Sequence, residues 1–491
     1  MGKTSRRALL LSAVCACLAL AVATTSSPAY ATNFWTDSNL YFTIGRGMTR
    51  GLMPYRDLFD HKGLLIFLLY ALGALLSDTS FLGVFALEVV SLTAMLFFAW
   101  RTVALYGEGR LTLLAIPVTA LVTVCSTAFN QGGSAEEFCL GALSVGLYAA
   151  LRCLRGEARP AGLHAAFGAA MGWVLWIKYT DCGLFFALGL CVLLEALCAR
   201  GVRQALRAAL AMLAGLAAVT LPIMAYLGVN GVLDDMIQVY FIQNIFEYGG
   251  ASMSLKGHVL NALAYLRTQS AANPVMAALA MAGCVFASAD ALGREGRGRL
   301  LGAAAVPLGA GLLLLLCYWG EMAHPYYALV FASLAPLGLI PLGWIAGYVP
   351  GRVSAAAACL SVLLILPVCR AQCAAVPLLQ VRREDMPQTA FAAIMRAEGE
   401  PTLLDLTSLD QGFYLAAGIT PTCRYFANNN LNTREKRDAL DGYLAEGRTM
   451  FVVSCWEEPG ENYGLVAEQA GVFDLNDRRV YKLYRRVEEK L

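Results

Sequence analysis

Charged side chains that could do chemistry gather near the start of a very apolar chain. The stretch FWTDSNLYF, residues 34–42, contains Asp37, and MPYRDLFDHKG, residues 53–63, contains Asp57, Asp60, His61 and Lys62. A carboxylate can take a proton from a hydroxyl group, and a lysine ammonium is a compact charge that binds anions. Ionisable residues are costly in a membrane protein unless they have a purpose, so these side chains are the first candidates for a site.

Three later segments add ionisable side chains that the same site could use. They are Glu136 and Glu137 in NQGGSAEEF, Lys178 and Asp181 in WIKYTDCG, and Glu321 and His324 in YWGEMAHPYY. The two glutamates could simply favour the dipole at the start of a helix, or they could bind hydroxyl groups or a divalent metal. His324 could hold a phosphate or another oxygen ligand, or it could be a satisfied histidine at the interface. Glu88 lies inside an apolar run, where an ionisable group indicates a partner that the sequence does not name.

The composition predicts a polytopic α-helical membrane protein with a soluble tail. The 491 residues are 58% hydrophobic and 15% charged, whereas a soluble domain carries about 25% charged residues. A net charge of +2 implies no nucleic-acid partner. Residues 380–491 hold 14 Lys/Arg and 18 Asp/Glu, which is 32 of the 72 charged residues in the chain. We therefore predict a membrane domain over residues 1–372 and a soluble α/β domain over residues 380–491.

The cysteines give no pattern that is typical of a zinc site. There are 15 cysteines and only four histidines, and no C-x-x-C occurs. Twelve cysteines lie in or beside apolar runs, where they are expected to behave as small hydrophobic residues. Cys423 and Cys455 lie in the tail, and the sequence leaves open whether they form a disulfide.

Eleven apolar runs are candidates for membrane-spanning helices, each expected to approach the roughly 20 residues that a bilayer requires. They are residues 8–26, 82–100, 111–128, 138–152, 163–179, 182–199, 207–228, 273–289, 300–318, 326–347 and 353–370. A twelfth run, Gly63 to Leu76, has only 14 residues, so we expect an interfacial or re-entrant helix inside a first outer loop of about residues 32–81.

The distribution of arginine predicts which loops face the cytoplasm. If the run Gly63 to Leu76 does not span, the inward loops hold Arg101, Arg110, Arg152, Arg155, Arg159, Arg200, Arg203, Arg207, Arg294, Arg297, Arg299 and Arg352. If that run did span, every later loop would change sides and the bias would be inverted. We therefore predict a cytoplasmic N-terminus, an extracytoplasmic tail, and all the candidate site residues on the outer face of the cytoplasmic membrane.

The first-loop pattern resembles a known superfamily. An acidic residue after the first helix in TDSNLYF, then G-x-x-P-Y-R-D-L-F-D-H-K-G and a short apolar helix, is similar to the glycosyltransferase-C (GT-C) enzymes. The nearest groups are the protein O-mannosyltransferase-like (family 39) and aminoarabinose-transferase-like enzymes. Members retain their first helix, so the resemblance favours an uncleaved helix here over a signal peptide cleaved after Ala31.

The resemblance implies a hexosyl or pentosyl transfer from a polyprenyl-phosphate sugar to a hydroxyl on a glycan, lipid or protein. It carries the family's catalytic base onto Asp37, for which the alternative is a helix N-cap. It carries the lysine near the carrier phosphate onto Lys62, although Gly63-Leu64 replaces the usual proline pair. Lys62 could otherwise be a snorkelling anchor.

Chemical need adds further candidates around these two residues. Lys178 and Arg56 could assist at the donor phosphate. Asp57, Asp60, His61, Glu136, Glu137 and His324 could contact acceptor, sugar or metal, although MPYRDLFD could also be a turn followed by a cap. No cofactor is certain, and a divalent cation is an open choice.

Strands are predicted for the tail at TLLDLT, TMFVVSCW and RRVYKLYRRV, and helices at REKRDALDGYLAEG and NYGLVAEQAG. Two other functions are compatible with the composition: a transporter or flippase of lipid-linked envelope intermediates, and a non-catalytic envelope scaffold. A transporter would favour internal repeats and broken helices at mid-membrane, and the sequence shows no repeat.

Overall fold

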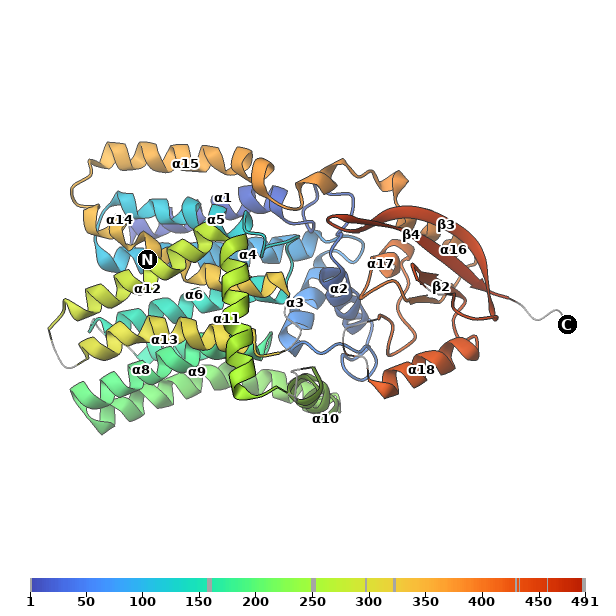
Figure 1. The fold of residues 1–491 in the computed structure, drawn as a ribbon, viewed down its shortest axis with the longest axis horizontal. Helices are drawn as coiled ribbons and strands as arrows, with labels where there is room; N and C mark the ends of the chain where they lie inside the picture. The colour runs from blue at the N-terminus through green and yellow to red at the C-terminus, as the bar shows by residue number, and fades with distance from the viewer. Residues whose placement is uncertain are drawn as a thin grey trace.

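Long apolar helices form most of the structure (Figure 1). The computed structural model describes residues 2–156, 161–248, 253–295, 298–320, 324–428, 431, 433–456 and 458–487. Within these residues, eight helices are long and apolar enough to cross a membrane. They are α1 (Lys3–Ala23), α4 (Leu82–Val103), α6 (Ala135–Leu154), α8 (Gly183–Arg200), α9 (Val202–Val229), α12 (Pro274–Leu292), α13 (Arg299–Cys317) and α15 (Gly351–Gln372).

The other three predicted spans are helical but shorter or broken. Two are short apolar helices, one ending in α5 (Ala115–Val124) and the other α7 (Ala161–Leu175). The third is a pair, Pro325–Ser333 and Ala335–Ile345, bent by 46° and including α14 (Ile340–Ile345); counted as one span, it brings the described total to nine. The predicted class, a multi-pass helical membrane protein with a small sheet in the tail, is confirmed. The number eleven stays a prediction.

The first outer loop contains two helices, of which the sequence predicted only α3 (Leu64–Leu76). The second is α2 (Thr36–Thr49), whose mixed polar and apolar residues give no clear amphipathic face because nearly all of them are buried. The two helices pack closely at Gly45, where a Cβ would lie 2.5 Å from the backbone nitrogen of Ala71. The helix α2 begins after Trp35, so Asp37 lies in its first turn and is not the N-cap; that alternative is wrong.

The tail contains a four-stranded sheet in the order β1-β2-β4-β3. Its strands are β1 (Leu403–Asp405), β2 (Phe451–Ser454), β3 (Tyr463–Asp474) and β4 (Asp477–Arg486), and β1 pairs with β2 in parallel while the other pairs are antiparallel. The short helices of the tail are α16 (Pro387–Arg396), α17 (Phe413–Ala417) and α18 (Arg434–Ala445). Cys423 and Cys455 are both free thiols.

One predicted element of the tail is wrong. The segment NYGLVAEQAG was predicted as a helix, but residues 463–474 form β3, which runs antiparallel to β4 with Asp474 opposite Asp477. The turn Leu475-Asn476 between them contains the asparagine that is typical of hairpin turns. Pairing along the whole length of β4 supplies hydrogen bonds that outweigh the helix propensity of Leu, Ala, Glu and Gln.

The helix α2 connects the membrane helices to the tail, as Figure 1 shows. The hydroxyl of Thr43 donates to Asp410 Oδ2 at 2.7 Å, and Arg46 Nη2 donates to the carbonyl of Ile419 at 3.2 Å. Nearby, the backbone N–H of Phe59 donates to the carbonyl of Arg424 at 2.9 Å. Because these groups are buried, their hydrogen bonds fix the tail against the segment that carries Asp37.

A long π-helix follows the short helix α10 (Leu233–Met236). It spans Ile237–Tyr248 and leads toward α11 (Leu255–Ala272). The π-helix is rare and is often found at functional sites. Its wide turn brings Tyr240, Asn244 and Tyr248 to one side of the helix, where all three line a cavity described below.

Loops predicted to face the cytoplasm meet at one end of the helices. Arg155 Nη1 lies 2.7 Å from Asp290 Oδ2, and Arg294 Nε lies 2.9 Å from the same oxygen. The guanidinium of Arg155 also lies 4.3 Å from the ring centre of Tyr106. The predicted alternation of loops is therefore consistent with the fold, while their orientation in a membrane stays a prediction. Arg159, Arg297 and Glu321 lie outside the described residues.

Candidate active site

Asp37 lies at the wall of a polar cavity of about 430 Å³ between the membrane helices and the tail. The hydroxyl of Tyr326 donates to Asp37 Oδ2 at 2.9 Å. The ring of Trp35 packs edge to face against Tyr326 with ring centres 5.3 Å apart, so the tyrosine is held by both Asp37 and Trp35. The cavity is completed by Ser408, Leu409, Phe473 and Asp474 of the tail.

Burial makes Asp37 a better base than an exposed aspartate. It raises the pKa of Asp37 to about 6, while the charge of Lys62 and the hydrogen bond from Tyr326 act in the opposite direction. The carboxylates of Glu136 and Asp60 add to the rise. A carboxylate with this pKa is ionised at neutral pH but accepts a proton more readily than an ordinary aspartate.

A second cavity, of about 390 Å³, adjoins the first and is mainly apolar. It is lined by the membrane helices and the π-helix, and two lysines, Lys62 and Lys178, reach it. The two cavities share the adjacent residues of one segment: Tyr326 lines the polar cavity and Tyr327 the apolar one. An apolar space with cationic groups at one side is suited to a lipid chain that carries an anionic head.

The backbone around Lys62 is held in a defined position. The hydroxyl of Tyr55 donates to the carbonyl of Lys62 at 2.8 Å, and the N–H of Gly63 donates to the carbonyl of Ile177 at 3.1 Å. A Cβ on Gly63 would lie 2.1 Å from the carbonyl oxygen of Trp176, and a proline there could not donate. The glycine that replaces the proline of the related motif is thus required by this chain's own packing.

The two lysines differ in their partners. Lys178 is buried and forms an ion pair with Glu136, and its ammonium lies 3.3 Å from the ring centre of Tyr327. Burial lowers the pKa of Lys178, but Glu136 and Asp181 together raise it above its ordinary value. Among the described residues, no carboxylate lies within ion-pair distance of Lys62. Lys62 therefore keeps its charge available for a ligand, whereas Lys178 already shares its charge with Glu136.

His61 is held in one tautomer by the π-helix. The amide nitrogen of Asn244 donates to the carbonyls of His61 and Tyr240, so the amide oxygen faces His61 Nδ1 at 2.6 Å and accepts its proton. Burial and the charge of Lys62 lower the pKa of His61 to about 3, so the ring is neutral. Its Nε2, which carries no proton in this tautomer, lies 4.0 Å from Asp60 Oδ1.

Lysines of both the first loop and the tail act on the pKa of Asp60. Burial raises its pKa to about 6, against the lowering effect of Lys62 and of the backbone N–H groups of His61 and Lys62. Lys436 of α18 also lowers the pKa of Asp60, so a lysine of the tail acts at this site. Lys436 was not predicted, because it lies in an otherwise ordinary amphipathic helix.

His324 lines the polar cavity beside Asp37. Its ring stacks on Tyr326 with the centres 5.3 Å apart. Burial and the nearby charges of Lys62 and Lys178 lower the pKa of His324, so the ring is neutral near pH 7. Its Nε2 has no hydrogen-bond partner among the described residues. A hydroxyl group of a ligand in the cavity could satisfy that nitrogen.

Three candidates from the sequence lie away from these cavities. Arg56 and Asp57 pair with each other at 2.8 Å on the surface, and Asp57 accepts from the N–H of Met53. For Asp57 the turn interpretation is confirmed. Glu137 accepts from the N–H of Gly133 at 2.7 Å, while its own N–H donates to Ser134, the N-cap of α6. Glu137 therefore has the role of a capping residue.

Two further observations concern partners and metals. Glu88, whose partner the sequence did not name, accepts a hydrogen bond from Thr24 at the end of α1 at 2.8 Å. Among the described residues, the only group of His, Cys, Asp or Glu side chains close enough to share one ion consists of Cys125, Cys369 and Cys373, outside both cavities.

Sequence reasoning missed several residues of the site. Tyr326 and Tyr327 belong to the segment YWGEMAHPYY that the sequence singled out, but their separate roles on two cavities were not predicted. Asn244 and Tyr248 were missed because the period of a π-helix differs from 3.6 residues per turn. Phe473 and Asp474, which lie just after the segment predicted as a helix, were missed because the hairpin of β3 and β4 that brings them to the cavity was not predicted.

Comparison with solved structures shows which fold this is. Two crystal structures of ArnT from Cupriavidus metallidurans match 98% of this chain and 98% of their own. The apo state has a TM-score of 0.61 at 15% sequence identity, and the state bound to undecaprenyl phosphate has 0.59 at 14%. A cryo-EM structure of arabinofuranosyltransferase AftD from Mycobacteria has 0.50 at 16%, over 99% of this chain and 42% of that one.

The chain therefore shares the fold of ArnT, which is consistent with the GT-C-like fold expected from its first-loop motif. The match extends over nearly the full length of ArnT, including the tail. No protein-family model matches the chain, and no curated protein is similar to it in sequence. At this low identity the likeness concerns the fold, and the protein O-mannosyltransferase-like side of the resemblance stays untested.

Proposed function

We propose that this protein is an integral-membrane glycosyltransferase that moves a sugar from a polyprenyl-phosphate donor to an acceptor hydroxyl. The observation that carries the proposal is that adjacent residues, Tyr326 and Tyr327, line two cavities of different chemistry, one containing Asp37 and the other Lys62. The apolar cavity fits the first part of a lipid chain, and the polar cavity fits a hydrophilic acceptor. The fold shared with ArnT, one structure of which holds undecaprenyl phosphate, supports this assignment.

Each residue then has a defined task in the transfer. Lys62 binds the donor phosphate and stabilises the negative charge that develops as the phosphate leaves. Lys178, paired with Glu136, orients Tyr327, since its ammonium lies over the tyrosine ring. Asp37 takes the proton of the acceptor hydroxyl while that oxygen attacks the anomeric carbon.

The expected stereochemistry is inversion. Direct attack opposite the leaving phosphate requires one base and one cationic group, and it forms no covalent sugar–enzyme bond. The bond from the anomeric carbon to the phosphate oxygen breaks as the new glycosidic bond forms. The proton passes to Asp37 and the polyprenyl phosphate leaves with the electron pair of the broken bond.

The orientation of the site follows from the predicted topology. With the arginine-rich loops in the cytoplasm, both cavities open at the outer face of the cytoplasmic membrane, together with the tail. Single cysteines introduced near Arg155 or Arg203 should resist a membrane-impermeant thiol reagent in intact cells, and a cysteine at Asp438 should react. The reverse pattern would overturn this orientation.

Reconstitution in lipid vesicles tests the function itself. The purified protein is supplied with polyprenyl-phosphate sugars and candidate acceptors, with Mg²⁺ or Mn²⁺ and with a chelator, and the release of free polyprenyl phosphate is measured by mass spectrometry. A glycosyltransferase consumes the donor and forms a new glycoside. A flippase would move the intact donor across the bilayer, and a scaffold would do neither, so either result would refute the proposal.

A further inference from the structure

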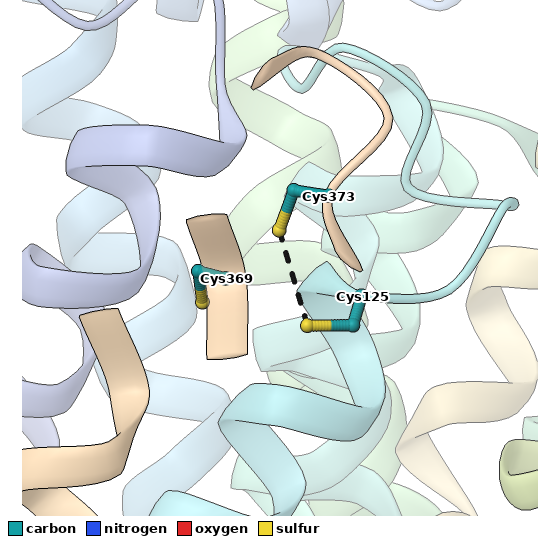
Figure 2. Close-up of side chains that lie close together, drawn as sticks. All are labelled: Cys125, Cys369 and Cys373. Carbon is teal, nitrogen blue, oxygen red and sulfur yellow. Dashed lines mark hydrogen bonds between the residues drawn. The ribbon is translucent and has the colours of Figure 1, made fainter. Parts of the chain in front are cut away.

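Three cysteines meet where two membrane helices end (Figure 2). Cys125 directly follows α5, Cys369 lies in the last turn of α15, and Cys373 directly follows α15. Their three sulfur atoms all lie within 4.8 Å of one another. Cys369 and Cys373 are buried and Cys125 is partly exposed, so a small ion could enter from one side.

The spacing of the sulfur atoms is that of ligands around one metal ion. With a zinc–sulfur bond of about 2.3 Å, two ligands are about 3.8 Å apart in a tetrahedral site and about 4.0 Å apart in a trigonal one. The Cys125 and Cys373 sulfur atoms are 3.9 Å apart. A disulfide would join only two of the three at about 2.05 Å and would leave the third cysteine without a role.

The helix ends around the cluster favour a cation. The C-termini of α5 and α15 carry partial negative charge from carbonyl groups that have no partner within the helix. The carbonyl of Val124, the last residue of α5, accepts from the Cys373 thiol at 3.4 Å. Such surroundings disfavour thiolates without a counter-ion and stabilise a bound cation.

The rest of the cluster's environment is apolar. Cys369 and Cys373 belong to a core that includes Leu20 of α1, Leu92 of α4 and Val124 of α5. Soft thiolate ligands in apolar surroundings select zinc, copper(I) and their heavier relatives over magnesium or calcium. The cluster lies outside both cavities of the proposed active site, so its role does not depend on that function.

We propose that Cys125, Cys369 and Cys373 bind one thiophilic divalent cation of the zinc group. Each thiol that becomes a ligand loses its proton to water, so three ligands release three protons for each cation. The bound ion would join the end of α5 to the end of α15, the helix that leads into the tail. Its effect would be to stabilise the connection between the membrane helices and the tail.

Cadmium provides a direct spectroscopic test on the full-length protein. The detergent-solubilised protein is reduced with a phosphine, and Cd²⁺ is added while the ultraviolet thiolate-to-metal absorption is recorded. We expect saturation at about one Cd²⁺ per chain and competition by Zn²⁺. Cys125→Ser, Cys369→Ser and Cys373→Ser should each weaken binding by more than about tenfold, because each removes a ligand.

Cys284→Ser is the matched control. Cys284 is a partly buried free thiol on α12, outside the cluster, and its replacement should leave Cd²⁺ binding unchanged. Thermal unfolding gives a second readout: Cd²⁺ should raise the midpoint of the wild type and of Cys284→Ser but not that of a cluster variant. This comparison is valid even if a cluster variant is less stable, because each protein is its own reference.

Two results would overturn the proposal. One is a wild-type protein that elutes as a folded species and shows no thiolate–cadmium absorption. The other is a quantitative Cys125–Cys373 disulfide in peptide maps of protein purified without reductant, which would make the cluster a redox pair.

Discussion

The cavities on the two sides of Tyr326 and Tyr327 differ in charge as well as in polarity. Among the described residues, the lining of the apolar cavity includes two lysines and no carboxylate. The lining of the polar cavity includes two carboxylates, Asp37 and Asp474, and no lysine or arginine. An anionic lipid head is therefore attracted to one side and repelled from the other. This difference indicates how donor and acceptor could bind in separate cavities and still meet at the anomeric carbon of the donor sugar.

The two cavities also come from different parts of the chain. Membrane helices and the π-helix form the apolar cavity, whereas α2, the loop before α6 and the tail form the polar one. Changes in the tail can alter the polar cavity without touching the other. If the proposed function is correct, donor and acceptor specificity are separable by mutation.

The largest expected effect is at Asp37, on the wall of the polar cavity. Asp37→Asn keeps the shape and the hydrogen bond from Tyr326 but removes the base, so turnover should fall by about 10²-fold or more. Donor binding, measured by thermal shift with polyprenyl phosphate, should be unchanged because the lysines remain.

The unfolding temperature of Asp37→Asn distinguishes a loss of turnover from misfolding of the variant. The pKa of Asp37 is raised on folding, from an ordinary value of 3.8 to about 6. The folded state therefore binds a proton more tightly than the unfolded state, and ionisation of Asp37 lowers stability as the pH rises through this range. At neutral pH Asp37→Asn should unfold at the same temperature as the wild type or a higher one. Turnover within a few-fold of wild type would instead direct attention to Asp60.

The next largest effect is expected at Lys62 in the apolar cavity, and it should change the use of the donor only. Lys62→Ala removes a charge-assisted contact to the donor phosphate, which corresponds to about 10- to 100-fold in donor kcat/KM. The acceptor KM should stay the same. Lys256→Ala, which removes an exposed lysine of α11, is the control for the change in net charge.

Lys178 provides the contrast to Lys62. Lys178→Met leaves Glu136 buried without its partner, so it should lower the free energy of unfolding by about 3 kcal/mol. The double variant with Glu136→Gln should recover most of that stability. If Lys62→Ala and Lys178→Met were equally stable and lost donor kcat/KM to the same extent, the two lysines would not have the different roles assigned to them.

Much of this arrangement could be predicted from local sequence. The first-loop residues Asp37, Lys62 and His61 stood out because ionisable groups are rare beside apolar runs, and periodicity and length identified the helices. Arginine counts grouped the loops, and contacts such as Arg155 with Asp290 agree with that grouping, while the side that each group faces stays a prediction. These features depend on residues that are close in sequence.

The features that were missed depend on distant contacts. The helix α2 is covered on several faces, so no amphipathic pattern marks it. The pairing of Lys178 with Glu136 joins residues 42 positions apart, so neither local segment indicates it. The strand β3 follows from its pairing with β4, which the residues of β3 alone do not encode.

A smaller effect is expected on the pH dependence of the reaction. The Tyr326 hydroxyl donates to the ionised carboxylate of Asp37 and so lowers its pKa. Tyr326→Phe should raise that pKa and move the acidic limb of kcat/KM, expected near pH 6 in the wild type, upward by about one unit. Activity above pH 8 should change little. A profile that does not move would show that the limb belongs to another group.

The smallest effect should be confined to the polar side. Asp474 lies at the turn between β3 and β4, and its Oδ1 accepts from Gln131, another residue of the cavity wall, at 3.3 Å. Asp474→Ala removes a hydrogen-bond acceptor for the hydroxyl groups of an acceptor, so the acceptor KM should rise by about three- to tenfold. The donor KM and the pH profile should stay as in the wild type, since Lys62 and Asp37 are unchanged. Asp438→Ala, on the exposed face of α18, removes the same charge from the tail and should have no effect. If Asp474→Ala instead raised the donor KM, the two cavities would not be separate binding sites, because a change in the tail would then reach the lipid side of Tyr326 and Tyr327.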